Sequence, residues 1–273
     1  QADPSHYLVY REQDAIIPEG YCATHIPAEV ERIQDRSSGP SRIAGECLLV
    51  EIALASDFEL YQDFGSNETS VENFMLNSLA NVQTNYDDEF ADEIQFEVVT
   101  TFIATCSATS CDPWTNNTNA GTLLDDFTDW GNGGGFGVTF DVATLWTGRN
   151  FNGGTIGVAW LSGVCNNLRY NTCENFSSNA SLIRVVWAHE LGHNFSSGHD
   201  AGGSGFIMAP SVNNTNTWSP ASINTINNFV SNANCVGDCE SSLDPPIAFI
   251  EVSRDEACTE SYVGFFDESE GVV

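Results

Sequence analysis

The chain has 273 residues and a hydrophobic content of 41%, enough for one packed domain of roughly 200 residues with appended segments. Its formal net charge is −30 and its eight basic residues are all arginines, so nucleic acid and anionic membranes are excluded as partners. No apolar run approaches about 18 residues, and the sequence therefore predicts no membrane span.

Nine cysteines, several of them closely spaced, are typical of a protein that folds in an oxidising compartment. They predict a secreted, extracellular protein with disulfide bonds. Because the sequence begins at Gln1, without methionine and without an apolar leader, we expect that a signal peptide has been removed or lies outside this sequence. The acidic surface has two open explanations: adaptation to a saline or cold marine habitat, and simple solubility of a secreted protein.

Residues 1–44 show little periodicity, and we interpret them as an N-terminal extension or propeptide remnant. Regular patterns begin at residue 47. In chain order they predict a strand (47–55), an amphipathic helix (70–90), a strand (94–104), a short helix (123–130), two strands (141–146 and 155–164), a helix (182–195), and a last helix from Pro220 to about residue 232 with Ser219 as its N-cap. This order predicts an α/β sandwich with a twisted mixed sheet.

The helix predicted at 182–195 carries the start of the stretch H-E-L-G-H-N-F-S-S-G-H-D. His189 and His193 lie at i and i+4, about 40° apart around the helix, so both imidazoles can reach one metal ion. Glu190 points to the side, where it can accept a proton from water at that ion. His199 can join the same ion only if the helix ends and the chain turns back. Three imidazoles with one open position are typical of a catalytic zinc.

This stretch resembles the metzincin signature H-E-x-x-H-x-x-G-x-x-H, and Met208 in G-F-I-M-A-P resembles its Met-turn. Asp200, directly after the third histidine, is similar to the adamalysin (reprolysin) branch. The resemblance implies a metzincin-type catalytic domain at 45–240, with a twisted mixed five-stranded sheet, an active-site helix, the Met-turn and a C-terminal helix. It implies a secreted zinc endopeptidase, a hydrolase in which Met208 forms the floor of the zinc site and residues 209–212 form the wall of the adjoining pocket.

One residue departs from the family pattern. Ser196 occupies the position of the family's glycine, and glycine follows only at Gly198. Serine tolerates a left-handed backbone less well than glycine does. We therefore expect either that the turn needs no positive φ or that it has moved towards Gly198.

Residues 141–165 resemble the family's segment through its edge strand. The resemblance implies that this strand binds extended substrate by antiparallel backbone pairing, a form of β-augmentation. A plain edge strand without a ligand is the alternative. The candidate substrate-binding residues are Gly157, Val158, Ala159, Trp160 and Leu161.

The same resemblance implies a calcium site formed by Glu51, Asp141, the Cys235 carbonyl and Asp238, because oxygen atoms are the ligands that calcium prefers. It also pairs Cys165 with Cys235. Cys106 with Cys111 is a plausible local disulfide, and Cys173 with Cys239 would follow. A rival pairing, Cys165–Cys173 with Cys235–Cys239, stays open from the sequence alone.

Residues 241–273 resemble the opening strands of a PKD-like β-sandwich that is cut off inside the module, and Cys258 would then have its partner beyond Val273. A flexible extension is the alternative. At the other end, Cys22 has two interpretations. It can form a disulfide with Cys47, or its thiolate can occupy the open zinc position and keep the protein a latent zymogen.

The sequence thus predicts a monomeric secreted metalloprotease that acts on protein or peptide substrates, with Glu190 as its general base. Its expected cofactors are zinc and, as the resemblance implies, calcium. The rival from another class is a zinc-bearing adhesion or binding module without catalysis. The presence of Glu190 argues against that rival, because binding alone needs no base.

Overall fold

The computed structural model describes residues 21–25, 47–90, 93–106, 111–239, 250–252 and 265–267. The chain forms two compact units, Gln1–Gly237 and Asp238–Val273. In the second unit, β8 (Ile250–Val252) and β9 (Phe265–Asp267) pair as antiparallel strands. The PKD-like interpretation of this unit stays a prediction, and Cys258 lies outside the described residues.

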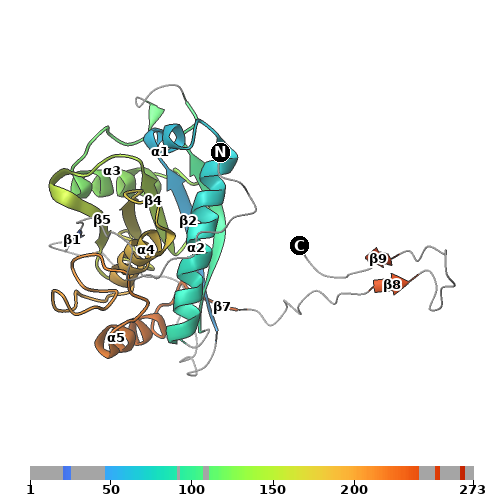
Figure 1. Ribbon diagram of the computed structural model, residues 1–273, viewed down its shortest axis with the longest axis vertical. Coiled ribbons are helices and arrows are strands. Elements are labelled where there is room, and N and C mark those ends of the chain that lie inside the picture. Colours follow the sequence, from blue (N-terminus) through green and yellow to red (C-terminus); the bar gives the residue numbers. More distant parts are fainter. Residues whose placement is uncertain are drawn as a thin grey trace. The chain divides into compact units, whose positions relative to one another are not determined.

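The first unit alternates strands with helices, as the sequence predicts (Figure 1). Its elements are β1 (Tyr21–His25), β2 (Leu48–Ser56), α1 (Phe58–Asp63), α2 (Glu68–Phe90), β3 (Ile94–Ile103), α3 (Ala120–Asn132), β4 (Val142–Thr147), the short 3₁₀ turn η3 (Asn152–Gly154), β5 (Thr155–Trp160), β6 (Tyr170–Glu174), α4 (Ala180–Asn194), α5 (Pro220–Val230) and β7 (Gly237–Asp238).

Five strands form the twisted mixed sheet in the order β5-β6-β4-β2-β3. All neighbours in it are parallel except β5, which runs antiparallel to β6. Two further strands extend this sheet: β1 pairs in parallel with β5, and the short β7 pairs with β2. The predicted five-stranded fold is confirmed, and β1 covers the edge of β5.

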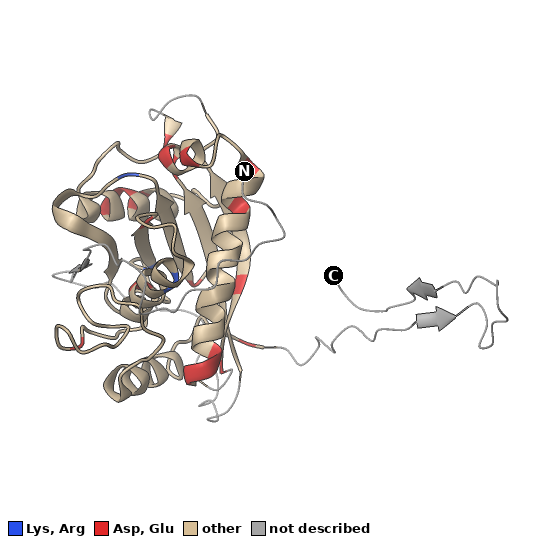
Figure 2. Ribbon diagram, in the orientation of Figure 1, with Lys and Arg blue, Asp and Glu red and all other residues tan. Residues whose placement is uncertain are grey.

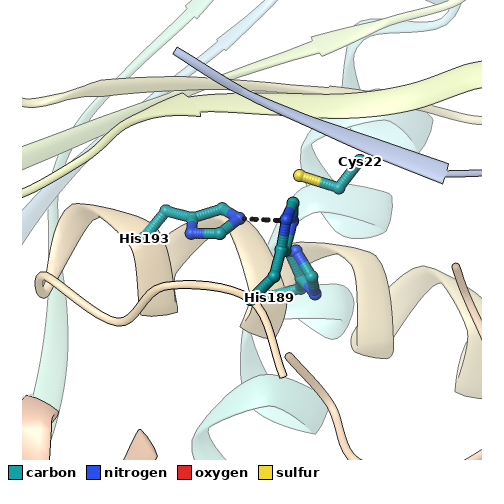
Figure 3. A group of neighbouring side chains, drawn as sticks. Cys22, His189 and His193 are labelled. Carbon is teal, nitrogen blue, oxygen red and sulfur yellow. Dashed lines mark hydrogen bonds between the residues drawn. The ribbon is translucent and has the colours of Figure 1, made fainter. Parts of the chain in front are cut away.

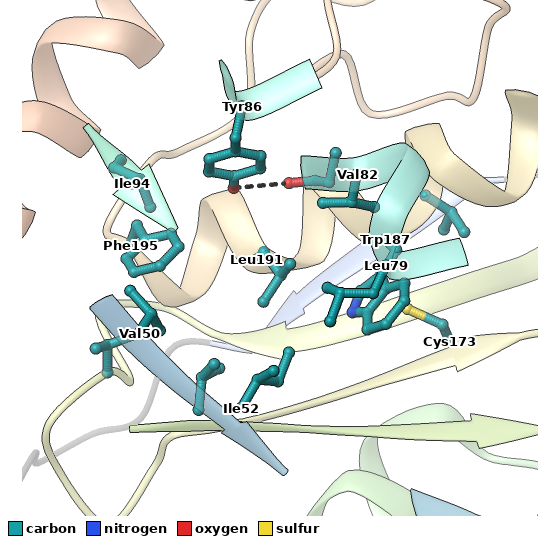
Figure 4. Packing of buried hydrophobic residues seen from close by; sticks show 14 of the residues in the cluster. Val50, Ile52, Leu79, Val82, Tyr86, Ile94, Cys173, Trp187, Leu191 and Phe195 are labelled. Atoms are coloured by element: carbon teal, nitrogen blue, oxygen red, sulfur yellow. Dashed lines mark hydrogen bonds between the residues drawn. The ribbon is translucent and has the colours of Figure 1, made fainter. Parts of the chain in front are cut away.

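Helices cover both faces of the sheet and bury two hydrophobic clusters. On one face, α2 and α4 pack together over β2, and Val82, Trp187 and Leu191 lie in that cluster (Figure 4). Between the two helices the Tyr86 hydroxyl donates to the Ala188 carbonyl over 3.4 Å. On the other face, α3 packs its apolar side against β5 and β6, with Phe127 fully buried. The double cover explains why the central strands read as continuous apolar runs.

Helix α1 and strand β6 are among the elements that the sequence did not predict. Helix α1 has only six residues and is begun by Asp57, whose carboxylate accepts from the Leu60 N–H over 2.9 Å. Strand β6 reads Y-N-T-C-E, a short polar stretch without apolar alternation, although every residue in it is buried. Both are too short for a periodic pattern to emerge.

The disulfide predictions are correct in two cases and wrong in the others. Cys106–Cys111 and Cys165–Cys235 are bonded. Cys47 and Cys239 are also disulfide-bonded, and β7 lies against β2, which begins directly after Cys47. Cys173 is a buried thiol in β6, so neither Cys173–Cys239 nor Cys165–Cys173 exists, and Cys235–Cys239 is excluded as well. The Cys22–Cys47 pairing is wrong too, because Cys22 retains its thiol.

A buried arginine holds the loops at the carboxyl ends of β2 and β4. Arg149 is 4% exposed and forms ion pairs with Asp57, Glu59 and Asp112. The Thr147 hydroxyl also donates to Asp57. This Arg149 cluster joins α1, the segment after the Cys106–Cys111 disulfide and the end of β4 into one ionic network.

Candidate active site

Helix α4 places two histidines of the signature on one face. It starts at the N-cap Asn179, whose side chain accepts from the Ser181 N–H over 2.9 Å. His189 and His193 follow in its last two turns, with ring centroids 4.6 Å apart. After Asn194 the helix ends, and the chain turns back so that the His199 ring lies 5.1 Å from His189 and 4.7 Å from His193. The three imidazoles thus converge as predicted.

Backbone carbonyls orient the two buried rings. The Nδ1 atom of His189 bonds to the Ile207 carbonyl over 2.6 Å, and Nδ1 of His193 bonds to the Ser197 carbonyl over 2.7 Å. Since Nδ1 then carries the proton, the lone pair of Nε2 faces the other rings. Burial lowers the pKa of His193 to about 3, and burial together with His193 lowers that of His189 well below its usual range. Both rings are therefore neutral and can offer the Nε2 lone pair to a metal ion.

The donor set fits a zinc ion. The Nε2 atoms of His193 and His199 lie 3.2 Å apart, close to the roughly 3.3 Å expected for two nitrogens on one tetrahedral zinc. Nε2 of His189 is buried and has no hydrogen-bond partner among the described residues, an arrangement that costs free energy unless a ligand meets it. Ligand atoms of these three residues and of Cys22 all lie within 4.8 Å of one another.

Glu190 is fully buried beside this group, facing β5. Burial raises the pKa of Glu190 well above its usual range, and the nearby Cys22 side chain partly opposes the shift. A Cβ atom on Gly157 would collide with the Glu190 carboxylate. The sequence singled out Gly157 as a substrate contact, but its lack of a side chain also makes room for Glu190.

The turn after α4 is left-handed at Ser196 itself. Its φ is +78°, whereas Gly198 is not among the residues with positive φ. Both alternatives drawn from the sequence are therefore wrong. Ser162, also left-handed with φ +60°, lies 2.8 Å from it through the two hydroxyl oxygens, and the Ser162 N–H donates to the His193 carbonyl over 2.9 Å. These bonds compensate the strain of a non-glycine residue in this conformation.

The Met-turn lies directly below the histidines. Met208 is completely buried, and its sulfur would lie 2.6 Å from a Cβ atom on Gly192, so glycine in H-E-L-G-H allows the methionine to approach α4. The Asp200 N–H donates to the Met208 carbonyl over 2.8 Å. The Asp200 carboxylate accepts from the Ser219 hydroxyl over 2.7 Å. Through these two bonds Asp200 positions the preceding residue, His199, relative to the Met-turn and to the start of α5.

Asn194 is a positioning residue that the sequence did not reveal. Its buried amide donates to the Trp160 carbonyl over 3.0 Å and to the Tyr170 carbonyl over 3.1 Å, and its oxygen accepts from Asn171 over 2.7 Å. It fixes the end of α4 to β5 and β6. A buried asparagine at a helix terminus is the available signal, but its partners are 23 or more positions away.

The Cys22 thiol reaches this site from β1 (Figure 3). Strand β1 runs parallel to β5, with Cys22 opposite Gly157 and Ala23 opposite Val158. The Cys22 N–H also donates to the Pro210 carbonyl over 3.2 Å. A small cavity beside the histidines is lined by Cys22, Ile156, Val185, Val186, His189, Ile207, Ala209 and Val212. Ala209 and Val212 thus line the pocket that the sequence assigned to residues 209–212.

The predicted substrate strand is present, and its side chains divide between two faces. Val158 and Trp160 are buried in the cluster under α3, and the Trp160 indole N–H donates to the Thr128 hydroxyl over 2.9 Å. At this edge β5 can therefore pair with a further strand only through its backbone. Ala159 and Trp160 lie in register with β1, and Leu161 comes directly after the end of β5. The substrate role of residues 157–161 stays a prediction.

The predicted calcium ligands come partly together. The Glu51 N–H donates to the Asp141 carboxylate over 3.0 Å, and the Asp141 N–H donates to the Glu51 carbonyl over 2.8 Å. Cys235 is bonded to Cys165, and Asp238 lies in β7 beside β2. In the described ranges, only two groups bring three or more ligand side chains within 4.8 Å, and these residues form neither. Calcium stays a prediction.

Comparison with known proteins agrees with this site. Residues 49–236 match Metallo-peptidase family M12 (Reprolysin_5). Zinc metalloproteinase-disintegrin-like atragin of Naja atra is 36% identical over 63 residues, which are 23% of this chain and 10% of that protein. Snake venom metalloproteinase trimerelysin-2 of Protobothrops flavoviridis is 41% identical over 61 residues, 22% of this chain and 30% of that protein. The matched stretches thus span at most 30% of these curated relatives.

A chain in a solved structure titled "Structure of a chaperone-substrate complex" superposes with a TM-score of 0.53 at 16% identity, over 70% of this chain and 35% of that one. At this identity the similarity concerns the fold alone. In the described part of the chain, no helix is long and apolar enough to cross a membrane. The family match at 49–236 spans well over half of the 273 residues and includes His189, His193 and His199. The chain therefore belongs to Metallo-peptidase family M12, the reprolysin-type metalloproteases.

Proposed function

We propose that the protein is a secreted zinc endopeptidase in which His189, His193 and His199 hold the metal and Glu190 is the general base. The convergence of three neutral imidazoles beside a buried carboxylate is the observation that carries the proposal. Secretion is supported by the disulfides Cys106–Cys111 and Cys165–Cys235, which are typical of oxidising compartments.

In the proposed reaction a zinc ion supplies Lewis acidity that polarises the scissile carbonyl and the attacking water. The Glu190 carboxylate accepts the proton of the attacking water and returns it to the leaving amine nitrogen. Gly157 lets β5 pass close to that carboxylate. An extended substrate pairs its backbone with β5, and the side chain after the scissile bond enters the apolar cavity at Ile156, Val186 and Val212.

Glu190→Gln, introduced into the Cys22→Ser chain so that inhibition by Cys22 cannot hide the result, tests the proposal, since it keeps the shape of the side chain and removes the base. We expect a fall in kcat of about 1000-fold or more on casein, with zinc content unchanged. Thr84→Ala, an exposed change on α2, serves as the control. Equal rates for the Cys22→Ser chain with and without Glu190→Gln would instead support a zinc-bearing binding module.

We also infer that the full chain is a latent zymogen, because the Cys22 thiol lies among the three histidines and β1 occupies the edge of β5. A thiolate is a strong zinc ligand and would fill the position that water needs. Strand β1 runs parallel to β5, opposite to the direction proposed for a substrate, so it blocks the edge without presenting a cleavable bond in the productive direction.

Cys22→Ser tests latency in the full chain, compared with a chain that begins at Ala44. We expect the full wild-type chain to be at least ten times slower on casein than either variant. Equal rates for all three proteins would show that residues 1–43 do not inhibit.

A further inference from the structure

A second hollow lies away from the zinc ligands, between the first half of α2 and the segment that joins β6 to α4. It measures about 780 Å³, within the range of ligand-binding clefts. Ala180 and Ile183 of α4 line this groove, while Val185, Val186 and His189 of the same helix line the cavity at the zinc site. One helix therefore contributes to both sites.

The groove carries no charge. None of the thirteen described residues that line it is acidic or basic, although the chain contains 38 acidic residues. The acidic residues of α2 lie towards its two ends, and no charged residue occurs between Glu72 and Asp87 (Figure 2). Asparagine amides, serine hydroxyls and phenyl rings line the groove instead. Such a surface suits an uncharged ligand that has many hydrogen-bonding groups.

Three of the asparagines form a ladder along α2. Asn73, Asn77 and Asn81 recur every four residues, about 6 Å apart along the helix axis. Their side chains are exposed, and their amides form no hydrogen bond with another residue in the described ranges. In an extended polypeptide, backbone groups that face the same side recur about every 6.6 Å. Each asparagine amide offers one acceptor and two donors, the complement of those backbone groups.

Aromatic rings give the groove a firm floor. The Phe74 ring packs edge-on against buried Trp146 at 5.0 Å and lies 5.1 Å from Phe64. Across from them, Phe176 packs against the same core cluster and leaves part of its ring exposed. The rings can therefore receive apolar side chains of a bound segment without first being ordered.

We propose that this groove binds an extended, uncharged segment of the polypeptide substrate, so that it is a second substrate-binding site on the catalytic domain. This inference rests on the proposed endopeptidase function. Peptide is favoured over a neutral oligosaccharide because the ladder repeat approaches the strand repeat, and because α4 links the groove to the zinc site.

The sheet also fixes which side of the substrate reaches the groove. Strand β5 is antiparallel to β6, so the start of β5 lies at the end of β6 that leads into Asn175 and Phe176 of the groove. A substrate antiparallel to β5 leaves the site at the start of β5 with its carboxyl-terminal part. The groove therefore binds residues that follow the scissile bond.

Direct binding tests the groove without any need for catalysis. The probe is a fluorescein-labelled, end-blocked peptide of roughly twelve Ser, Asn, Val and Ala residues, which spans about 40 Å when extended. It is titrated into the full wild-type chain, into the triple variant Asn73→Ala, Asn77→Ala, Asn81→Ala, and into the control Thr69→Ala, Thr84→Ala. All five positions are exposed on α2, and alanine favours the helix.

We expect the triple variant to bind the probe about tenfold more weakly, and the control to match the wild type. Equal binding by the triple variant and the wild type would overturn the proposal. The proposal would also be overturned if maltohexaose displaced the probe from the wild type and the triple variant no longer bound maltohexaose. The groove would then be a glycan-binding site.

Kinetics in the Cys22→Ser full chain separate this inference from the proposed function. Extending a cleaved casein-derived peptide by the probe sequence on its carboxyl side should lower KM about tenfold with kcat unchanged, and an amino-side extension should not. Loss of the carboxyl-side effect in the triple variant supports the groove, and its persistence refutes it. Probe binding through the ladder in a protein that cleaves no peptide would refute the protease and retain the groove.

Discussion

Two groups of side chains in the first unit have ligand atoms close enough to hold a metal ion. They differ in whether a basic residue of the chain already lies among those atoms. Cys22, His189, His193 and His199 converge without an arginine from the described part of the chain, whereas Asp57, Glu59 and Asp112 surround Arg149. Proximity of ligand atoms is the same in both, within 4.8 Å. In the first group the lone pairs face one another, and in the second they face a guanidinium. Convergent donors indicate a metal site only where the chain supplies no cation of its own.

The largest expected effect is on the histidine group. His193→Asn removes one ligand and its bond to Ser197. We expect zinc content, measured by atomic emission, to fall from one per chain to near zero, and casein hydrolysis by the Cys22→Ser protein to fall by about 1000-fold. Asp112→Asn is the matched change in the Arg149 cluster and should leave zinc content unaltered. Equal loss of zinc from both variants would contradict the assignment of zinc to the histidine group alone.

Removing the internal cation should cost stability instead of activity. Arg149→Met keeps much of the side-chain stem and leaves the carboxylates of Asp57 and Asp112 buried without a counter-ion. We expect the free energy of unfolding, measured with urea, to fall by about 3–5 kcal/mol. Zinc bound per folded chain should stay unchanged. If the free energy of unfolding fell by less than about 1 kcal/mol, Arg149 would not be what stabilises the buried carboxylates.

The pH dependence of the Arg149 cluster sharpens the comparison further. Burial, reinforced by the charges of Asp57 and Glu59, raises the pKa of Asp112 to about 7, while the Phe58 N–H and Arg149 oppose the shift. Between the unfolded pKa near 3.8 and about 7, the folded state binds more protons than the unfolded state. Stability from Asp112 is therefore present below pH 4 and is lost as the pH rises through 7.

Urea unfolding of the wild type and of Asp112→Asn at several pH values measures this effect. We expect the wild type to lose stability relative to the variant between pH 5 and pH 8. A relative gain over that range would show that Arg149 holds the pKa of Asp112 low.

The smallest effect concerns the turn that delivers His199. Ser196→Gly and Ser196→Ala both lose the bond to the Ser162 hydroxyl, but only the glycine variant removes the strain of φ +78°. We expect the glycine variant to unfold with a free energy about 1 kcal/mol higher than that of the alanine variant. Calorimetry of the zinc-loaded proteins measures the difference. An alanine variant as stable as the glycine variant would mean that the turn is not strained.

The convergence of the histidines could be predicted from the sequence because the evidence for it is local. His189, Glu190 and His193 lie within five residues, and helix geometry alone brings them to one side. The long periodic elements, such as α2 and β3, are found within two residues of their predicted bounds.

The Arg149 cluster could not be predicted, because Arg149 and Glu59 lie 90 positions apart and only the folded sheet brings them together. Cysteine spacing likewise leaves connectivity open, which is why Cys173 was wrongly paired. At Ser196, residue preference gave the wrong expectation because the Ser162 hydroxyl lies 34 positions away. Side chains that are close in the sequence could be placed together from the sequence alone. Contacts between distant segments, such as Ser162 with Ser196, could not.

The pairing of β1 with β5 also bears on solubility. Without β1, β5 becomes an open edge strand, and its unpaired N–H and C=O groups can join any extended chain, including β5 of another copy. Such edge-to-edge pairing begins aggregation. A net charge of −30 makes two copies repel each other. This negative charge would thus let the chain keep the edge of β5 open for a substrate without pairing with β5 of a second copy.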